Sequence, residues 1–226
     1  GYVGLFGYTL NGVAIKNVKL TDVNINMPAA AQSVYAAALV GFIKVNGSGT
    51  ASSVIDNCFA SGRITVKNAD KITVVGGLAG FTAVTNCGTN VDINADSGTQ
   101  RATIGGLVAW ASIQALFMND YALGNVTAAT EHDTYGNVGG LFGQVNGIVY
   151  NVYSAGTVTL NTSKTAYKAG ELAGDLAAAT YADSCYYSGS GDAFGKGTGS
   201  YNSENVVSKA GEIGTQAFAD VLHNNL

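Results

Sequence analysis

Short runs in which apolar and polar residues alternate recur along the chain, each bounded by Gly, Asn or Ser. Val158-Thr159-Leu160 is the clearest example, and Val23-Asn24-Ile25 and Val91-Asp92-Ile93 follow the same pattern. Alternation with a period of two is typical of a β-strand that buries one face. None of these runs has enough apolar surface to bury a core alone, so the strands are expected to stack on copies of themselves.

The runs belong to a repeating unit. It begins with the motif G-x-L-x-G, continues through the step N-[V/C]-x, and ends in a strand of the form V-x-[I/V/L]. Six copies can be aligned on their leucines, which are Leu5, Leu39, Leu78, Leu107, Leu141 and Leu172. The second and sixth copies are degenerate. The length between the Asn and the final strand hardly changes, so insertions are expected in the loop before the Asn and in the loop between repeats.

Stacking of such units predicts a parallel β-helix, or β-solenoid, of about six rungs. Each strand would pair with its equivalent in the next rung about 4.8 Å away, and the leucines would point inward. We expect the glycines to allow tight corners and positive φ, and the column asparagines to form a ladder of stacked amides at one turn. That column comprises Asn17, Asn57, Asn86, Asn119 and Asn151. A solenoid of helices is excluded by the abundance of Gly and β-branched residues, and a β-propeller is disfavoured because the shortest unit hardly accommodates four strands.

At Gly140-Leu141-Phe142-Gly143 and residues 151–158 (NVYSAGTV) the chain resembles the GLUG repeat family, and the resemblance extends over residues 1–187. It implies a right-handed parallel β-helix of the kind found in large secreted or surface-anchored proteins, mostly bacterial. Those proteins include adhesin-like proteins and the non-catalytic regions of some immunoglobulin A-cleaving metalloproteases. The resemblance concerns architecture and says little about function.

Residues 188–226 are expected to form a second part. The segment Ser188 to Ser203 is rich in Gly and Ser and is predicted to be a loop. Thr215 is a predicted N-cap for a short helix from Gln216 to His223, with Phe218, Val221 and Leu222 on one face. Because a solenoid end exposes unpaired strands and an open core, this helix is predicted to be a C-terminal cap.

Composition narrows the choice of partners. Of the 226 residues, 31 are Gly and 12% are charged, the net charge is −4, and Arg63 and Arg101 are the only arginines. A nucleic acid or an anionic membrane would require clustered cations, so neither is expected as a partner. No stretch approaches the ~20 apolar residues of a membrane span. The chain starts inside a repeat at Gly1 with no signal peptide, as a fragment of a longer polypeptide would.

A β-helix enzyme would need two carboxylates on one face, or calcium-binding acids beside a basic residue. The acids are scattered along the chain. A catalytic pairing of Asp92 with Arg63 or Arg101 is conceivable, but the favoured interpretation is that these residues lie on a solvated face. Residues 131–133 (Glu-His-Asp) form the densest ionisable cluster, which is interpreted as a polar loop tip. We therefore predict no catalytic, cofactor-binding or metal-binding residues, and no cofactor.

Two columns leave alternatives open. Cys58 and Cys87 follow the column asparagines in adjacent rungs, where a disulfide is possible but stacked buried thiols are favoured. The aromatic residues that come just after that position could form an exposed stack that binds sugars, or could pack over the corner, which is favoured. They are Tyr121, Tyr153, Tyr186 and Tyr187.

The sequence thus favours a non-catalytic rod within a larger extracellular or cell-surface protein, acting as an adhesin or a spacer. Its partners would be flanking domains of the same chain, or a glycan or protein of a host or cell surface. Binding would use the variable loops Pro28 to Val34, Lys44 to Ser53 and Ala128 to Asn137. The alternatives are a carbohydrate-binding or carbohydrate-active β-helix, and an accessory region of a surface protease.

Overall fold

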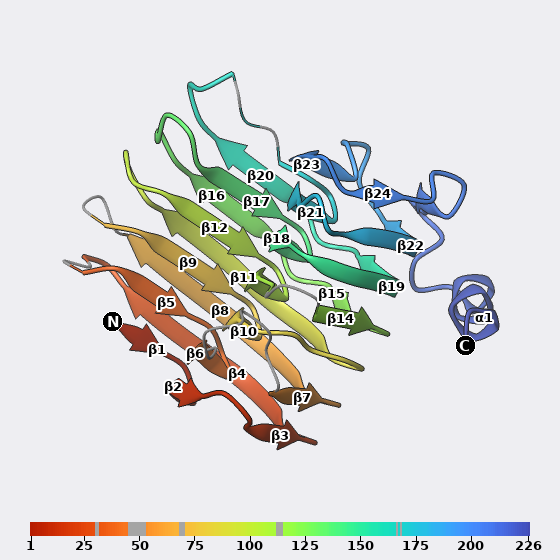
Figure 1. Ribbon diagram of the computed structural model, residues 1–226, viewed down its shortest axis with the longest axis horizontal. Helices are drawn as coiled ribbons and strands as arrows, with labels where there is room; N and C mark the ends of the chain where they lie inside the picture. Colours follow the sequence, from red (N-terminus) through yellow and green to blue (C-terminus); the bar gives the residue numbers. More distant parts are fainter. Residues whose placement is uncertain (30–31, 45–52, 68–70, 112–114, 166, 168) are drawn as a thin grey trace.

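The chain forms a β-solenoid in which the strands of successive turns lie side by side along one axis (Figure 1). The computed structural model describes residues 1–29, 32–44, 53–67, 71–111, 115–165, 167 and 169–226. Within these residues every strand pairing is parallel. The predicted fold class is therefore confirmed.

Three long sheets and one short sheet make up the walls. Sheet 1 contains β1 (Tyr2–Val3), β5 (Val34–Ala36), β9 (Thr73–Gly76), β12 (Ala102–Gly105) and β17 (Gly136–Gly139). Sheet 2 contains β2 (Phe6–Leu10), β6 (Val40–Lys44), β10 (Ala79–Phe81), β13 (Val108–Trp110), β18 (Phe142–Val145), β21 (Ala173–Leu176) and β23 (Phe194–Gly197). Each turn of the chain passes from sheet 1 to sheet 2 and then to sheet 3.

Sheet 3 is the widest and has two neighbouring columns of strands. One column comprises β16 (Val126–Ala129), β20 (Val158–Asn161) and the C-terminal parts of β4 (Lys19–Met27), β8 (Phe59–Lys67) and β11 (Gly88–Asp96), whose first residues pair into the other column. The other comprises β14 (Ala115–Met118), β15 (Tyr121–Ala122), β19 (Gly147–Ser154), β22 (Tyr181–Tyr187), β24 (Ser200–Tyr201) and β25 (Val206–Ser208). The short sheet pairs β3 (Ala14–Lys16) with β7 (Val54–Asp56).

About five turns are complete, in that each has a strand in all three long sheets. Among the described residues, the sixth repeat contributes β21 and β22, and in sheet 1 it contributes an isolated bridge between Gly139 and Gly170. This incomplete turn coincides with the copy that the sequence marks as degenerate.

The leucine column forms the centre of the core. Leu39, Leu78, Leu107 and Leu141 have no exposed surface, and Leu172 is 2% exposed, so the predicted inward orientation is confirmed for these five. Leu5 is 57% exposed because it belongs to the first turn, whose outer side has no further turn packed against it.

The motif glycines are required by a close approach of sheets 1 and 2, and not by positive φ as predicted. A Cβ on Gly139 would lie 2.2 Å from the carbonyl oxygen of Phe142, and one on Gly174 would lie 2.2 Å from the amide nitrogen of Val138. Neither glycine has a positive φ, whereas the corner asparagines do, with φ between 52° and 59°. Asn tolerates this left-handed conformation better than most residues. The corners predicted to need Gly are therefore formed by Asn.

The stack continues beyond Tyr187. The segment Ser188 to Ser203, predicted to be a loop, contains β23 and β24, which pair with β21 and β22. The sequence did not indicate these strands, because Gly and Ser residues give little alternation of apolar and polar side chains. The helix α1 (Gln216–Asn224) agrees with the prediction, and the Thr215 side chain accepts a hydrogen bond from the Phe218 amide at 3.2 Å.

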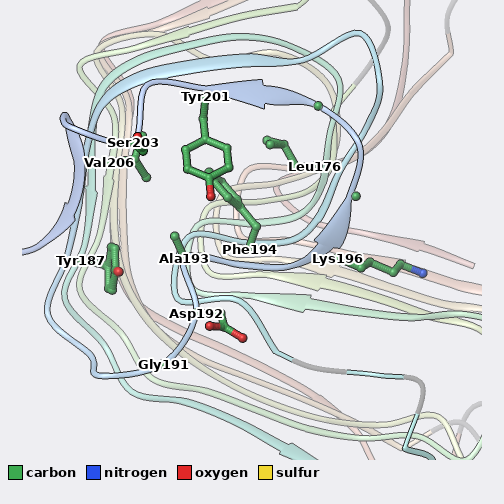
Figure 2. Close-up of a pocket in the computed structure, with 12 residues that line it drawn as sticks. Leu176, Tyr187, Gly191, Asp192, Ala193, Phe194, Lys196, Tyr201, Ser203 and Val206 are labelled. Carbon is green, nitrogen blue, oxygen red and sulfur yellow. The ribbon is translucent and has the colours of Figure 1, made fainter.

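The helix does not cover the open end of the solenoid, so the prediction of an end cap is wrong. It lies beside the turns, where the Phe218 ring packs between those of Tyr153 and Tyr186. The end itself is a mouth of about 500 Å³ lined by residues between Leu176 and Val206, with Phe194 and Tyr201 pointing into it (Figure 2). The amphipathic pattern of the helix identifies its buried face but not the surface that this face contacts.

Candidate binding face

The carboxylates and arginines considered for catalysis are used in bonds between turns. Asp92 pairs in register with Arg63, and both line a hollow of about 380 Å³. However, Asp92 Oδ1 accepts hydrogen bonds from the amide nitrogen of Asn125 at 2.8 Å and from its Nδ2 at 3.2 Å. Arg63 Nε donates to Asn24 Oδ1 at 3.2 Å. Arg101 lies elsewhere, with its guanidinium 3.9 Å from the centre of the Tyr135 ring.

The cluster at residues 131–133 lies at an exposed loop tip and has partners from the next turn. Glu131 accepts hydrogen bonds from the amide and hydroxyl of Ser163, and Asp133 forms an ion pair with Lys164 at 2.6 Å. These interactions hold the pKa of each carboxyl below its usual value. In the described part of the chain, no three His, Cys, Asp or Glu side chains are grouped so that they could hold a metal ion.

The corner asparagines form the predicted amide ladder with one break. Nδ2 of each residue donates to the preceding turn, at 2.7 Å from Asn57 to Asn17, 2.9 Å from Asn119 to Asn86 and 2.8 Å from Asn151 to Asn119. At the break, Asn86 Nδ2 donates instead to Asp56 Oδ1 at 2.7 Å. This bond lowers the pKa of Asp56.

The C-terminal helix extends this ladder from outside the repeats. In the sixth copy Ser184 occupies the Asn position with a φ of 53° and has no amide to donate. Asn225, directly after α1, donates from its Nδ2 to Asn151 Oδ1 at 3.1 Å and to the Tyr186 hydroxyl at 3.1 Å. The helix is therefore held to the corner by the same chemistry that joins one turn to the next.

The position after each corner asparagine faces the core. Cys58, Cys87 and Cys185 lie there as free buried thiols, so the stacked-thiol prediction is confirmed. The Cys58 amide points at the Cys87 sulfur, 3.4 Å away, and the Cys87 amide donates to Asp120 Oδ1 at 2.8 Å. The backbone amides of Cys58 and Cys87, just after the corner, thus donate to side-chain atoms of the next turn, a sulfur and a carboxyl oxygen.

Asp120 is a fully buried acid in this column. Its Oδ2 has no hydrogen-bond partner among the described residues. Burial is the main cause that raises the pKa of Asp120 well above the usual value, against the bond from Cys87, which lowers it. Burial therefore favours the neutral form of this carboxyl in the core, at the position where the neighbouring turn has Cys87.

The tyrosine column next to the corner is used for packing. Tyr121 and Tyr153 stack with their ring centres 5.3 Å apart and their planes 9° from parallel, and α1 covers Tyr153 and Tyr186 through Phe218. Tyr187 lies in a different column and lines the open mouth (Figure 2). The favoured interpretation of packing is thus confirmed for Tyr121, Tyr153 and Tyr186.

A second aromatic column, which sequence reasoning missed, lies on the outer face of sheet 2. It comprises Tyr8, Phe42, Phe81 and Trp110, with ring centres 5.9, 5.3 and 5.5 Å apart. From Tyr8 to Phe81 the rings are within 23° of parallel, but the Trp110 ring is turned by 88° from Phe81. The signal was present in the repeat, because each of these residues directly follows the last Gly, or Ala109, of the G-x-L-x-G motif.

The same column becomes polar beyond Trp110. Register pairs Trp110 with Gln144, Gln144 with Asp175, and Asp175 with Lys196. Gln144 Nε2 donates to Asp175 Oδ2 at 3.2 Å. Burial raises the pKa of Asp175, and the Lys196 charge acts in the opposite direction with a smaller effect.

Sheet 1 provides a wall beside this polar stretch. Tyr135, directly before β17, is 40% exposed and stacks with Arg101 of the preceding turn. Lys196 Nζ lies 5.5 Å from the centre of the Tyr135 ring and 5.7 Å from that of Tyr167. Figure 2 shows the Lys196 side chain pointing away from the mouth, toward this outer face. We call Trp110, Gln144, Asp175 and Lys196, with Tyr135, the outer strip.

Of the loops predicted to bind a ligand, residues 30–31 and 45–52 lie outside the described residues. The third loop, between β16 and β17, ends at the outer strip through Tyr135. The part of the chain that the structure describes contains no helix long and apolar enough to span a membrane. No family model, no curated protein and no solved structure matches the chain.

Proposed function

We propose that the chain is a non-catalytic β-solenoid module of a larger extracellular or cell-surface protein, serving as an adhesin or as a spacer that presents another domain. The observation that carries the proposal is that polar side chains suited to catalysis are instead bonded between turns, as Asp92 is to Asn125 and Asp133 is to Lys164. The flanking domains and the extracellular location are part of the proposal. They are supported by the resemblance of residues 1–187 to GLUG repeats.

The continuous strand pairing along the stack suits a rigid spacer. Parallel pairing extends through seven strands in sheet 2, so each turn is held to its neighbours by main-chain hydrogen bonds as well as by the Asn and Leu columns. Repeat proteins of this kind present long surfaces whose side chains can change without altering the fold. Such a surface is also suited to adhesion.

A carbohydrate-active β-helix is the second candidate, because Asp22, Arg63 and Asp92 line one hollow. The purified domain should be incubated with a panel of neutral and uronic acid polysaccharides, and products should be followed by mass spectrometry and by absorbance of unsaturated sugar ends. We expect no product. Release of oligosaccharides by the wild type but not by Asp92→Asn would overturn the non-catalytic proposal and establish the second candidate.

A further inference from the structure

We propose that the outer strip binds a neutral saccharide, and this inference rests on the proposed function because it names the ligand class of the adhesive surface. The starting observation is the change of character along one column. Tyr8, Phe42 and Phe81 stack on one another, so their faces are used within the column. Trp110 is turned by 88° and is 37% exposed, which frees part of its ring surface.

The polar groups beside Trp110 provide both kinds of hydrogen-bonding atom. Asp175 Oδ1 and Lys196 Nζ have no hydrogen-bond partner among the described residues, whereas Asp175 Oδ2 is held by Gln144. A carboxylate oxygen accepts and an ammonium donates, and a sugar hydroxyl does both. An aromatic surface next to such groups suits a saccharide, because a pyranose ring has an apolar C–H face and a rim of hydroxyls.

The size and charge of the strip favour this ligand over a protein. Trp110 and Lys196 are three turns apart, which is about 14 Å at the spacing of parallel strands, and the strip is one side chain wide with Tyr135 along its edge. A stable protein interface needs about 800 Å² on each partner, far more than this surface offers. Asp175 and Lys196 carry opposite charges, so the strip residues have no net charge that would favour an ionised ligand, and the acidic hexasaccharide tests the effect of Arg101 beside Tyr135.

The protein offers its own reporter, since Trp110 is its only tryptophan. Wild-type protein should be titrated with hexasaccharides of β-1,4-linked glucose, β-1,4-linked N-acetylglucosamine, β-1,3-linked glucose and α-1,4-linked glucose, with a galacturonate hexasaccharide as the acidic arm. We expect at least one neutral hexasaccharide to shift the Trp110 emission in a saturable way. The same solutions should be examined for cleaved products.

Variants separate the strip from the rest of the surface. Asp175→Asn should raise the dissociation constant by about tenfold, which corresponds to ~1.4 kcal/mol, and Trp110→Leu, measured by calorimetry, should abolish binding. Tyr181→Ala is the matched control, because Tyr181 is an aromatic residue of similar exposure in β22 of sheet 3. It should bind as the wild type does. Circular dichroism confirms that each variant is folded.

Each other outcome has a defined meaning. Absence of an emission shift with every neutral hexasaccharide overturns the inference and leaves the spacer function standing. Binding of the galacturonate hexasaccharide alone overturns the neutral class. Unchanged affinity in Trp110→Leu and Asp175→Asn places any binding elsewhere and equally overturns the inference. Cleavage of a bound hexasaccharide contradicts the proposed function instead.

Discussion

Each turn contributes one residue to the corner column and one to the outer column of sheet 2. The two columns differ in how many residue types they accept. The corner position requires a positive φ and offers an amide bond to the next turn, and Asn fills it in five copies. The outer column has ordinary strand geometry and changes from Tyr through Phe and Trp to Gln, Asp and Lys. The positive φ at the corner restricts that column to Asn in most turns. The outer column has no such backbone requirement, so its side chains, and the ligands they could bind, can vary.

The largest test of this contrast is Asn119→Ala in the corner. The change removes two side-chain hydrogen bonds, one of 2.9 Å donated to Asn86 and one of 2.8 Å accepted from Asn151. It also places Ala at a φ of 59°, which Ala adopts less readily than Asn. Left-handed strain of ~1–2 kcal/mol and about 1 kcal/mol for each lost hydrogen bond predict a loss of roughly 3 kcal/mol, measured by urea unfolding.

Asn119→Gly is the control that separates the two causes. Gly adopts the same φ without strain, so this variant should lose only the part due to the amide bonds, about 2 kcal/mol. Equal losses in the Ala and Gly variants would mean that positive φ is not what selects Asn, and the contrast between the two columns would then lack its physical basis.

The second test is Asp120→Asn, one position further along the corner. Because burial raises the pKa of Asp120, the folded state holds a proton that the unfolded state releases. Its contribution to stability is fully present below the unfolded pKa of ~3.9 and is lost as the pH rises through the raised folded pKa. At pH 7 the Asn variant should therefore be more stable than the wild type, and this advantage should shrink as the pH falls toward 4.

The measurement is urea unfolding of both proteins between pH 4 and pH 8, with the difference in free energy plotted against pH. Asp133→Asn is the matched control, since the Lys164 interaction lowers the pKa of that carboxyl and its effect on stability has the opposite sign. A difference between wild type and Asp120→Asn that stays constant with pH would show that folding does not raise the pKa of Asp120.

The same contrast explains what could be predicted from the sequence. The Leu and Asn columns repeat the same residue, so stacking, the inward leucines and the amide ladder followed from the repeat alone. The outer column shares a position but not a residue type, so a search for identical residues missed Phe81, Trp110 and Gln144 although each follows the motif directly. Contacts between segments that are not equivalent in the repeat, such as Phe218 with Tyr153, produce no periodic pattern in the sequence. They could be identified from the structure alone.

The smallest effect on stability is expected for Gln144→Ala in the outer column. Gln144 is partly exposed and loses one hydrogen bond, to Asp175 at 3.2 Å, with no demand on its φ. Surface substitutions of this kind change stability by about 0.5 kcal/mol or less, which urea unfolding can compare directly with the loss in Asn119→Ala. A loss above about 2 kcal/mol would place Gln144 with the corner asparagines as a structural residue. A near-neutral result, by contrast, leaves the outer column free to differ from one turn to the next, as a surface that varies with its ligand must.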